Sequence, residues 1–251
     1  MIDLKTDSGI AVIVIQHGKA NALDVELCDA IAQCFETLRS SDARAAVITG
    51  QGRMFSAGVD LLRISAGGAD YVRRLLPALH RLYDAAFFHP KPVVAAINGH
   101  AIAGGCVLAC CADRRVMVRE VGRIGVTEIL VGVPFPALAF EIMRHATPPY
   151  FFTETILTGE TFSAELAAHR GWVNEAVEPP MLMERAMAAA QNLAALSPAA
   201  FTQTKMQIRA PVSERIAQSG TATDKSVTDI WAAPATLAYI RDYVARTLKK
   251  S

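Results

Sequence analysis

The sequence lacks an excess of charge of either sign. Lys and Arg together number 25, Asp and Glu number 24, and the formal net charge is +1. A nucleic-acid partner requires a basic surface, so this balance argues against one. Hydrophobic residues make up 52% of the 251 residues. That share supports a large buried core, and the length suits one large domain or a domain with an appendage.

The sequence also lacks paired cysteines. Its cysteines are odd in number and form no C-x-x-C pair. The first residues carry acids and a short apolar run, without the basic start of a secretory signal. We therefore expect reduced thiols, no metal site and a cytoplasmic location. The five cysteines are Cys28, Cys34, Cys106, Cys110 and Cys111.

An uninterrupted membrane-length apolar run is missing as well. Residues 93–112 come nearest, but Asn98, His100 and three glycines lie within them, and charged Asp113 follows directly. Polar groups and glycine turns are costly in a bilayer, so we expect no membrane insertion. The first half of this stretch is instead typical of a buried strand, followed by a tight turn and a helix.

Strands and helices alternate along the first 180 residues, which favours an α/β fold. From Pro180 onward the apolar spacing is helical throughout. Several units share the order of an apolar strand, a glycine-containing turn and a helix. We expect strands at 10–16, 45–50, 92–97, 114–118, 122–126 and 172–177, and helices at 24–38, 69–88, 104–111, 135–145, 149–157, 163–170, 180–195, 198–209, 213–231 and 234–249.

Two glycine-containing loops could together bind a negatively charged oxygen. "FSAGVDL" (55–61) and "NGHAIAGGC" (98–106) each follow an expected strand and lead into an expected helix. The first amides of a helix have no partner within the helix, and glycine lets a ligand approach the backbone closely. Two such amides facing one carbonyl oxygen would form an oxyanion hole. Each loop taken alone is also a common strand-to-helix connection.

Taken together, four segments resemble the crotonase family, the enoyl-CoA hydratases and isomerases. They are "GKANALD" (18–24), "FSAGVDL" (55–61), "PKPVVAAINGHAIAGGCVLACCADRRV" (90–116) and "TEILVGVPFP" (127–136). The resemblance implies an α/β spiral of repeated ββα units with an acyl-CoA site, here over residues 1–195. It also implies a C-terminal α-helical trimerisation region, here over 196–251. A homotrimer or a hexamer would follow.

The resemblance also assigns roles to individual residues. Val59 and Gly104 would supply the two oxyanion amides. The CoA moiety would lie along Lys19, Ala20, Ala22, Leu23, Ala57 and Asp60. CoA would be part of the thioester substrate, so no separate cofactor is expected.

The acidic residues distinguish the reactions of the family. Hydratases of this family carry two glutamates, and one of them belongs where this chain has Val107. The other belongs at Glu128. A single carboxylate beside an oxyanion hole favours a shift of a double bond, so the pattern is closest to the Δ3,Δ2-enoyl-CoA isomerases. A hydratase with a replacement acid, another enolate reaction and a non-catalytic acyl-CoA binder remain alternatives.

Other residues have two interpretations each. Glu128 could be a salt-bridged structural residue, and His100 could be a turn residue or face the pocket. Phe135 could line the acyl pocket or belong to the core. The charged end "RTLKK" (246–250) could contact CoA phosphates or simply complement the dipole of a helix C-terminus.

Overall fold

A six-stranded sheet forms the base of the molecule. The computed structural model describes residues 1–120 and 122–247. The strand order is β1-β2-β3-β5-β7-β10, and from β2 onward every neighbour is parallel. β1 pairs antiparallel with β2. The bounds are Ile2–Asp7 for β1, Ile10–Ile15 for β2, Ala45–Gly50 for β3, Val93–Ile97 for β5, Arg114–Val118 for β7 and Glu175–Val177 for β10.

A second, smaller sheet stacks short strands in the order β4-β6-β8-β9. These strands are Met54–Ser56, His100–Ile102, Ile124–Gly125 and Thr161–Phe162. Along the chain, a strand of the large sheet is followed by a strand of the small sheet: β3 by β4, β5 by β6, and β7 by β8. A helix follows each of these strand pairs, namely α2 (Leu61–Phe87), α3 (Gly104–Cys110) or α4 (Glu128–Val131). The fold is therefore α/β with repeated ββα units, as the sequence predicts.

The helices begin where the sequence offers a cap. α1 (Val25–Arg39) starts at Asp24, whose side chain accepts a hydrogen bond from the amide of Leu27. Its buried face includes Leu27, Ile31 and Phe35 at helical spacing. α2 starts eight residues earlier than the expected position 69, because Asp60 caps a first helical stretch that ends at a kink. Gly68 makes this kink with φ 58° and ψ −147°.

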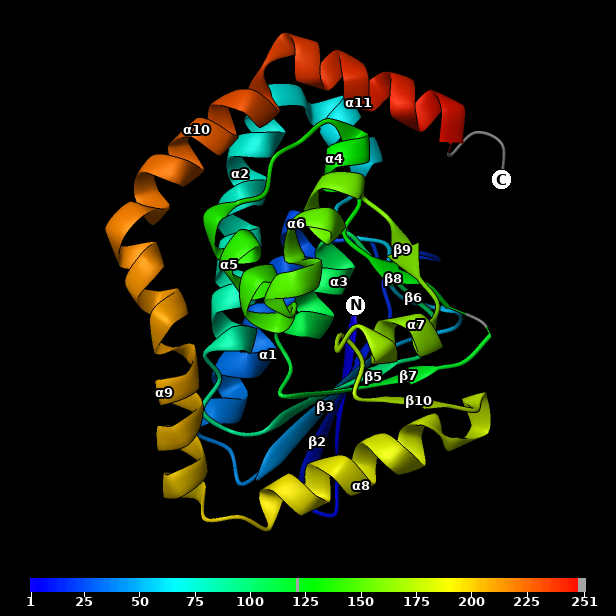
Figure 1. The fold of residues 1–251 in the computed structure, drawn as a ribbon, viewed down its shortest axis with the longest axis vertical. Coiled ribbons are helices and arrows are strands. Elements are labelled where there is room, and N and C mark those ends of the chain that lie inside the picture. Colours follow the sequence, from blue (N-terminus) through cyan, green and yellow to red (C-terminus); the bar gives the residue numbers. More distant parts are fainter. Residues whose placement is uncertain (121, 248–251) are drawn as a thin grey trace.

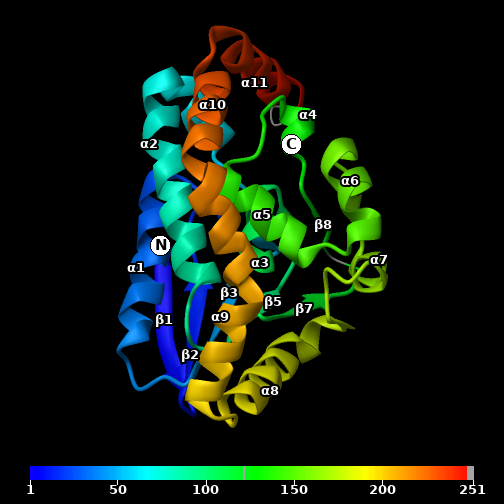
Figure 2. The same cartoon turned by 60° about the vertical axis from the view of Figure 1, so that its left-hand side comes forward.

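In Figure 1, α3, α5 and α6 lie near the centre of the molecule, and α8, α9, α10 and α11 run around its periphery. α10 packs on α2, and α9 packs on α5 (Figure 2). α8 covers one face of the large sheet with Leu182, Ala186 and Ala190. The bounds are Ala137–Ala146 for α5, Pro149–Thr158 for α6, Ala164–His169 for α7, Pro179–Met181 for η1, Leu182–Ala194 for α8, Pro198–Arg215 for α9, Ile216–Gly220 for the π-helical η2, Thr221–Ala232 for α10 and Pro234–Thr247 for α11.

Another expected helix boundary is wrong. The sequence predicts a break between 209 and 213, yet α9 continues through Pro211 to Arg215. A proline inside a helix removes one hydrogen bond, but Arg209 and Val212 on either side are buried against the core and hold the helix in place. The expected last helix reaches 249, and residues 248–249 lie outside the described part, as does most of "RTLKK". None of the described helices combines the length and apolarity of a bilayer span.

Candidate active site

The two glycine loops of the sequence meet in space. β4 and β6 are parallel neighbours, so the loops that follow them leave the small sheet side by side. Gly58 has φ 82°, and a Cβ built on it would lie 3.0 Å from the Gly104 nitrogen and 2.8 Å from the Ile102 oxygen. Only glycine at 58 allows this close approach of the two backbones.

Two amides at this contact are free of intramolecular partners. Among the hydrogen bonds of the described residues, Val59 N and Gly104 N donate none. Their neighbours are engaged: Asp60 N donates to Leu23 O at 3.1 Å, and Ala103 N donates to Gly125 O at 2.7 Å. Gly104 opens α3, where amides have no partner within the helix. Ala103 before it has a positive φ of 49°, a strained conformation typical of functional sites.

A cavity of about 600 Å³ lies beside these amides. It is lined by the expected residues Lys19, Ala20, Ala22, Ala57, Val59, Asp60, Gly104 and Glu128. The remaining expected residue, Leu23, does not line it, because its side chain is fully buried in the core. Its backbone instead ties the loops together, accepting from Asp60 N and donating to Gly58 O at 2.8 Å.

Glu128 brings a buried carboxyl to the cavity. It is the first residue of α4 and is 8% exposed. Its Oε2 is buried and, within the described chain, has no hydrogen-bond partner. Burial raises its pKa to about 8, and backbone hydrogen bonds from Glu128 and Thr127 oppose part of that shift. A carboxyl with this pKa can both accept and return a proton near neutral pH.

The second acid on the cavity wall is already engaged. Asp60 caps α2, accepting from Arg63 N at 3.0 Å, and its Oδ2 lies 4.0 Å from Arg63 Nε. Val107, where the resemblance places a second glutamate in hydratases, is fully buried in the core and does not line the cavity. Of the described residues that line the cavity, Glu128 and Asp60 are the carboxylates.

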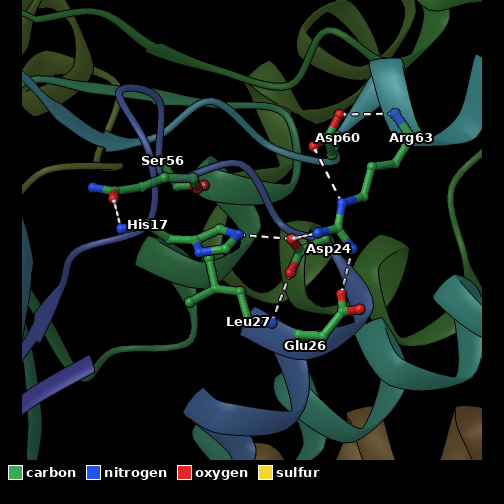
Figure 3. A network of polar contacts seen from close by, with 8 residues as sticks. His17, Asp24, Glu26, Leu27, Ser56, Asp60 and Arg63 are labelled. Carbon is green, nitrogen blue, oxygen red and sulfur yellow. Dashed lines mark hydrogen bonds and ion pairs between the residues drawn. The ribbon is translucent and has the colours of Figure 1, made fainter. Parts of the chain in front are cut away.

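A polar network fixes one rim of the cavity (Figure 3). His17 Nε2 lies 2.6 Å from Asp24 Oδ2, and Asp24 is fully buried. Arg63 reaches the same carboxylate at 3.3 Å and Glu26 at 2.6 Å. The network joins segment 17–24 to the starts of α1 and α2. His17 also lines the cavity, and the sequence analysis did not single it out.

Three aromatic residues of the wall were also missed. Tyr83 of α2 donates its hydroxyl to Gly104 O at 3.1 Å, and burial raises the pKa of this hydroxyl well above its usual value. Trp231 of α10 and Tyr243 of α11 line the cavity from the C-terminal helices. Two residues with alternative interpretations, His100 and Phe135, do not line it. Phe135 packs against Phe140 of α5 instead.

The five cysteines are free thiols, and four of them are buried. Within the described residues, His, Cys, Asp and Glu form no group that could hold a metal ion.

A paired-loop cavity with one buried carboxyl agrees with the family relationship of the chain. The family model described as enoyl-CoA hydratase/isomerase matches residues 5–233. The chain therefore belongs to the enoyl-CoA hydratase/isomerase family. A putative enoyl-CoA hydratase from Thermus thermophilus is 34% identical over 209 residues, covering 82% of each chain.

Solved structures include relatives with different names. One structure of a Mycobacterium tuberculosis protein, called an enoyl-CoA isomerase, is 31% identical with a TM-score of 0.79, covering 92% of this chain and 97% of that one. Another structure of the same protein, called a probable enoyl-CoA hydratase, is 30% identical with a TM-score of 0.81, covering 100% and 99%. Human mitochondrial Δ3-Δ2-enoyl-CoA isomerase is 21% identical with a TM-score of 0.94, covering 100% and 99%, and supports the fold alone. The names do not decide the reaction.

Proposed function

We propose that this enzyme moves the double bond of a 3-enoyl-CoA to C2, with Glu128 as its one acid–base residue and the amides of Val59 and Gly104 as an oxyanion hole. The CoA moiety would lie along segment 18–24 and the loop around Ala57. The cavity size of about 600 Å³ lies within the range of small-molecule sites. The proposal rests on family membership and on the chemistry of the residues that meet at this cavity.

The reaction needs one proton to leave C2 and one to arrive at C4. The Glu128 carboxylate takes the C2 proton, the C–H electron pair forms a C1=C2 bond, and the carbonyl π pair moves onto oxygen. The two amides stabilise this oxygen, and each such donor lowers the barrier by about 3 kcal/mol. The Glu128 carboxyl then protonates C4. The carbonyl re-forms, the new double bond lies between C2 and C3, and Glu128 is again a carboxylate.

One observation carries the proposal: Glu128 is a buried carboxyl beside the cavity whose Oε2 has no partner among the described residues. A buried structural carboxylate is normally paired or hydrogen-bonded, since an unpaired one destabilises the fold. Glu141 illustrates the structural case, with Arg144 and Arg215 each 3.3 Å away. The missing partner of Glu128 fits a group whose partner is a substrate proton.

Hydration is the alternative reaction, and the Thermus relative is named a putative enoyl-CoA hydratase. Adding water to a 2-enoyl thioester normally uses a second group that positions the nucleophile. Val107 cannot hold water, and Asp60 is engaged by Arg63. Both observations favour isomerisation.

The test compares wild type, Glu128→Gln and the matched control Glu141→Gln, another buried acid but one that does not line the cavity. Each is incubated with a 3-enoyl-CoA, and absorbance follows the conjugated 2-enoyl product. We expect Glu128→Gln to lose about 10²–10⁴-fold in kcat, the usual contribution of a general base, while the control stays within a few-fold.

Three outcomes would contradict the proposal. Undiminished turnover by Glu128→Gln would remove this residue from the mechanism. Faster loss of enoyl absorbance from crotonyl-CoA than formation of 2-enoyl product would identify a hydratase. Tight CoA-ester binding without turnover of either substrate would identify a non-catalytic acyl-CoA binder.

We also propose that residues 196–251 assemble the chain into trimers or hexamers beyond the core of residues 1–195. Ile230 of α10 and Tyr239 of α11 expose apolar surface that an assembly would cover, at 44% and 47%.

A further inference from the structure

A second cavity, of about 390 Å³, lies at the other end of α3 from Gly104. Among the described residues, the two cavities have no lining residue in common. The second is bounded by the end of α3, the start of β7, the end of α5 and the inner side of α9. Its charged lining residues are Asp113, Arg114, Arg115, Lys205 and Arg209.

The buried charges of this cavity do not balance. Lys205 and Arg209 are 4% and 3% exposed, and Arg115 is 9% exposed. Asp113 is their one carboxylate among the lining residues, and it lies 2.7 Å from both Lys205 Nζ and Arg209 Nη2. Arg114 is more exposed and pairs with Glu175 at 3.7 Å. Three buried cations therefore share a single anion.

Carbonyl oxygens satisfy part of the hydrogen bonding but carry no net charge. Arg115 donates to Trp172 O at 2.5 Å and to Ala112 O at 2.8 Å. Its third nitrogen, Nη2, takes part in no hydrogen bond found among the described residues. Arg209 Nη1 is buried and also has no partner in the described chain. Two guanidinium groups that line one cavity thus have donors without a partner in the described chain.

Burial and, to a lesser extent, the surrounding positive charge lower the pKa values of two groups that line this cavity. Burial lowers the pKa of Lys205 to about 8, with Arg209 adding to the shift and Asp113 opposing it. Burial also lowers the pKa of His145, which lines the same cavity, and Arg209 and Arg115 lower it further. Arg209 is held in position with its guanidinium 4.2 Å over the Phe87 ring.

A purely structural ion cluster would not need this excess. An ion pair that only joins α9 to β7 would be complete with one cation per carboxylate, and each further buried cation destabilises the fold. Planar guanidinium donors bind oxyanions in pairs of parallel hydrogen bonds. A cavity of this volume also lies within the range of small-ligand sites.

We propose that this cavity, built by Arg115, Lys205 and Arg209, is a binding site for a small dianionic metabolite that carries a phosphate ester or two carboxylates. Two negative charges on oxygen match the two cationic charges that Asp113 leaves uncompensated. The ligand's oxygens would accept from Arg115 Nη2 and Arg209 Nη1. The proposal does not depend on the reaction at Glu128.

The experiment is calorimetric titration of the full chain at constant ionic strength. Inorganic phosphate, glycerol 3-phosphate and succinate are compared as probes, with chloride as the control ion. We expect one site per chain for a phosphate probe, for succinate or for both, and the stronger binder identifies the class. Binding should persist in Glu128→Gln and in the presence of a saturating CoA ester, which separates this site from the proposed acyl-CoA site.

The variants locate the site. We expect Arg115→Gln and Arg209→Lys each to raise the dissociation constant of the probe at least tenfold. Arg209→Lys retains the positive charge but lacks Nη1. Arg73→Gln, at an exposed arginine that pairs with Asp70, should leave the dissociation constant unchanged. If the first two variants fail to fold, Arg114→Gln at the cavity edge should still weaken binding several-fold.

The proposal is overturned if no probe binds, if binding disappears with CoA ester present, or if none of the cavity variants weakens it. An acidic side chain from a second copy is the competing occupant. Light scattering that shows dissociation of Arg115→Gln, together with no binding of probes to wild type, would assign the cavity to a contact between copies and also overturn the proposal.

Discussion

The Glu128 carboxyl shows how one buried residue links stability to chemistry. Its pKa is raised to about 8 by burial, whereas in the unfolded chain it should lie near the usual 4.3. Between these two values the folded chain holds a proton that the unfolded chain has released. The ionisation of this group therefore lowers the free energy of unfolding as pH rises from about 4.3 to about 8. Above pH 8 the loss of stability is complete.

We predict that Glu128→Gln is more stable than wild type at pH 8, by about 4 kcal/mol from the size of the shift. The difference should shrink toward zero near pH 4, where both side chains are neutral. Urea unfolding at pH 4, 6 and 8 measures it, with Glu141→Gln as control. A difference that does not change with pH would show that burial does not set the protonation state of Glu128.

At the residue scale, the sequence was sufficient to predict the candidate site residues that lie within continuous motifs. Val59, Gly104 and Glu128 each follow a recognisable strand-and-glycine pattern, and all three line one cavity. Tyr83, Trp231 and Tyr243 come from long helices, where an aromatic residue facing the cavity has the same spacing as one facing the core. The position of such residues depends on how helices pack, which local pattern does not contain.

At the scale of single elements, the contact between two loops controls the candidate oxyanion amides. Gly58 sits where a Cβ would meet the backbone of Ile102 and Gly104. A backbone atom cannot swing away as a flexible side chain can, so a larger residue must displace a whole loop.

We predict that Gly58→Ala lowers kcat by at least about 10²-fold, the usual effect of losing one oxyanion donor. Gly52→Ala is the matched control, since Gly52 also has a positive φ, 73°, but has nothing within 4 Å of a built Cβ. The control should lose about 1 kcal/mol of stability from strain and retain activity. Steady-state kinetics and thermal unfolding measure both variants, and equal activities would remove the loop contact from the mechanism.

The long elements were predictable from sequence, and several of the short ones were not. Helix α1 and strands β3 and β5 carry enough residues for a periodic pattern. Strands β4, β6 and β9 and helix α4 span two to four residues each, too few to show a period. β1 was missed because it is a mostly exposed edge strand with polar residues. The small sheet, and hence the proximity of the two loops, follows only from the three-dimensional fold.

At the scale of the whole molecule, the C-terminal helices reach the cavity of their own chain. Trp231 donates to Pro134 O at 2.8 Å and lines the cavity, while Ile230 beside it is 44% exposed. α10 therefore presents one side to the cavity and another to the surface. An assembly through this outer side would restrain the wall of the site.

We predict that light scattering gives three or six times the 26.9 kDa mass of the chain. Ile230→Asp should raise the dissociation constant of the assembly at least tenfold, because it places a charge in an apolar contact. Leu157→Asp, at an exposed apolar residue of α6 outside the C-terminal region, is the control. A monomeric wild type at micromolar concentration would contradict the proposed assembly.

The amides of Val59 and Gly104 belong to the main chain, so their proposed electrostatic role does not depend on which side chain stands at those positions. Exchanging side chains around the cavity could redirect a bound thioester toward other products while leaving charge stabilisation untouched. Conversely, substitutions other than proline can displace these donors but cannot delete them, and proline also fixes the backbone angle φ. Replacing the peptide nitrogen of either residue by an ester oxygen would remove the donor while keeping the side chain unchanged.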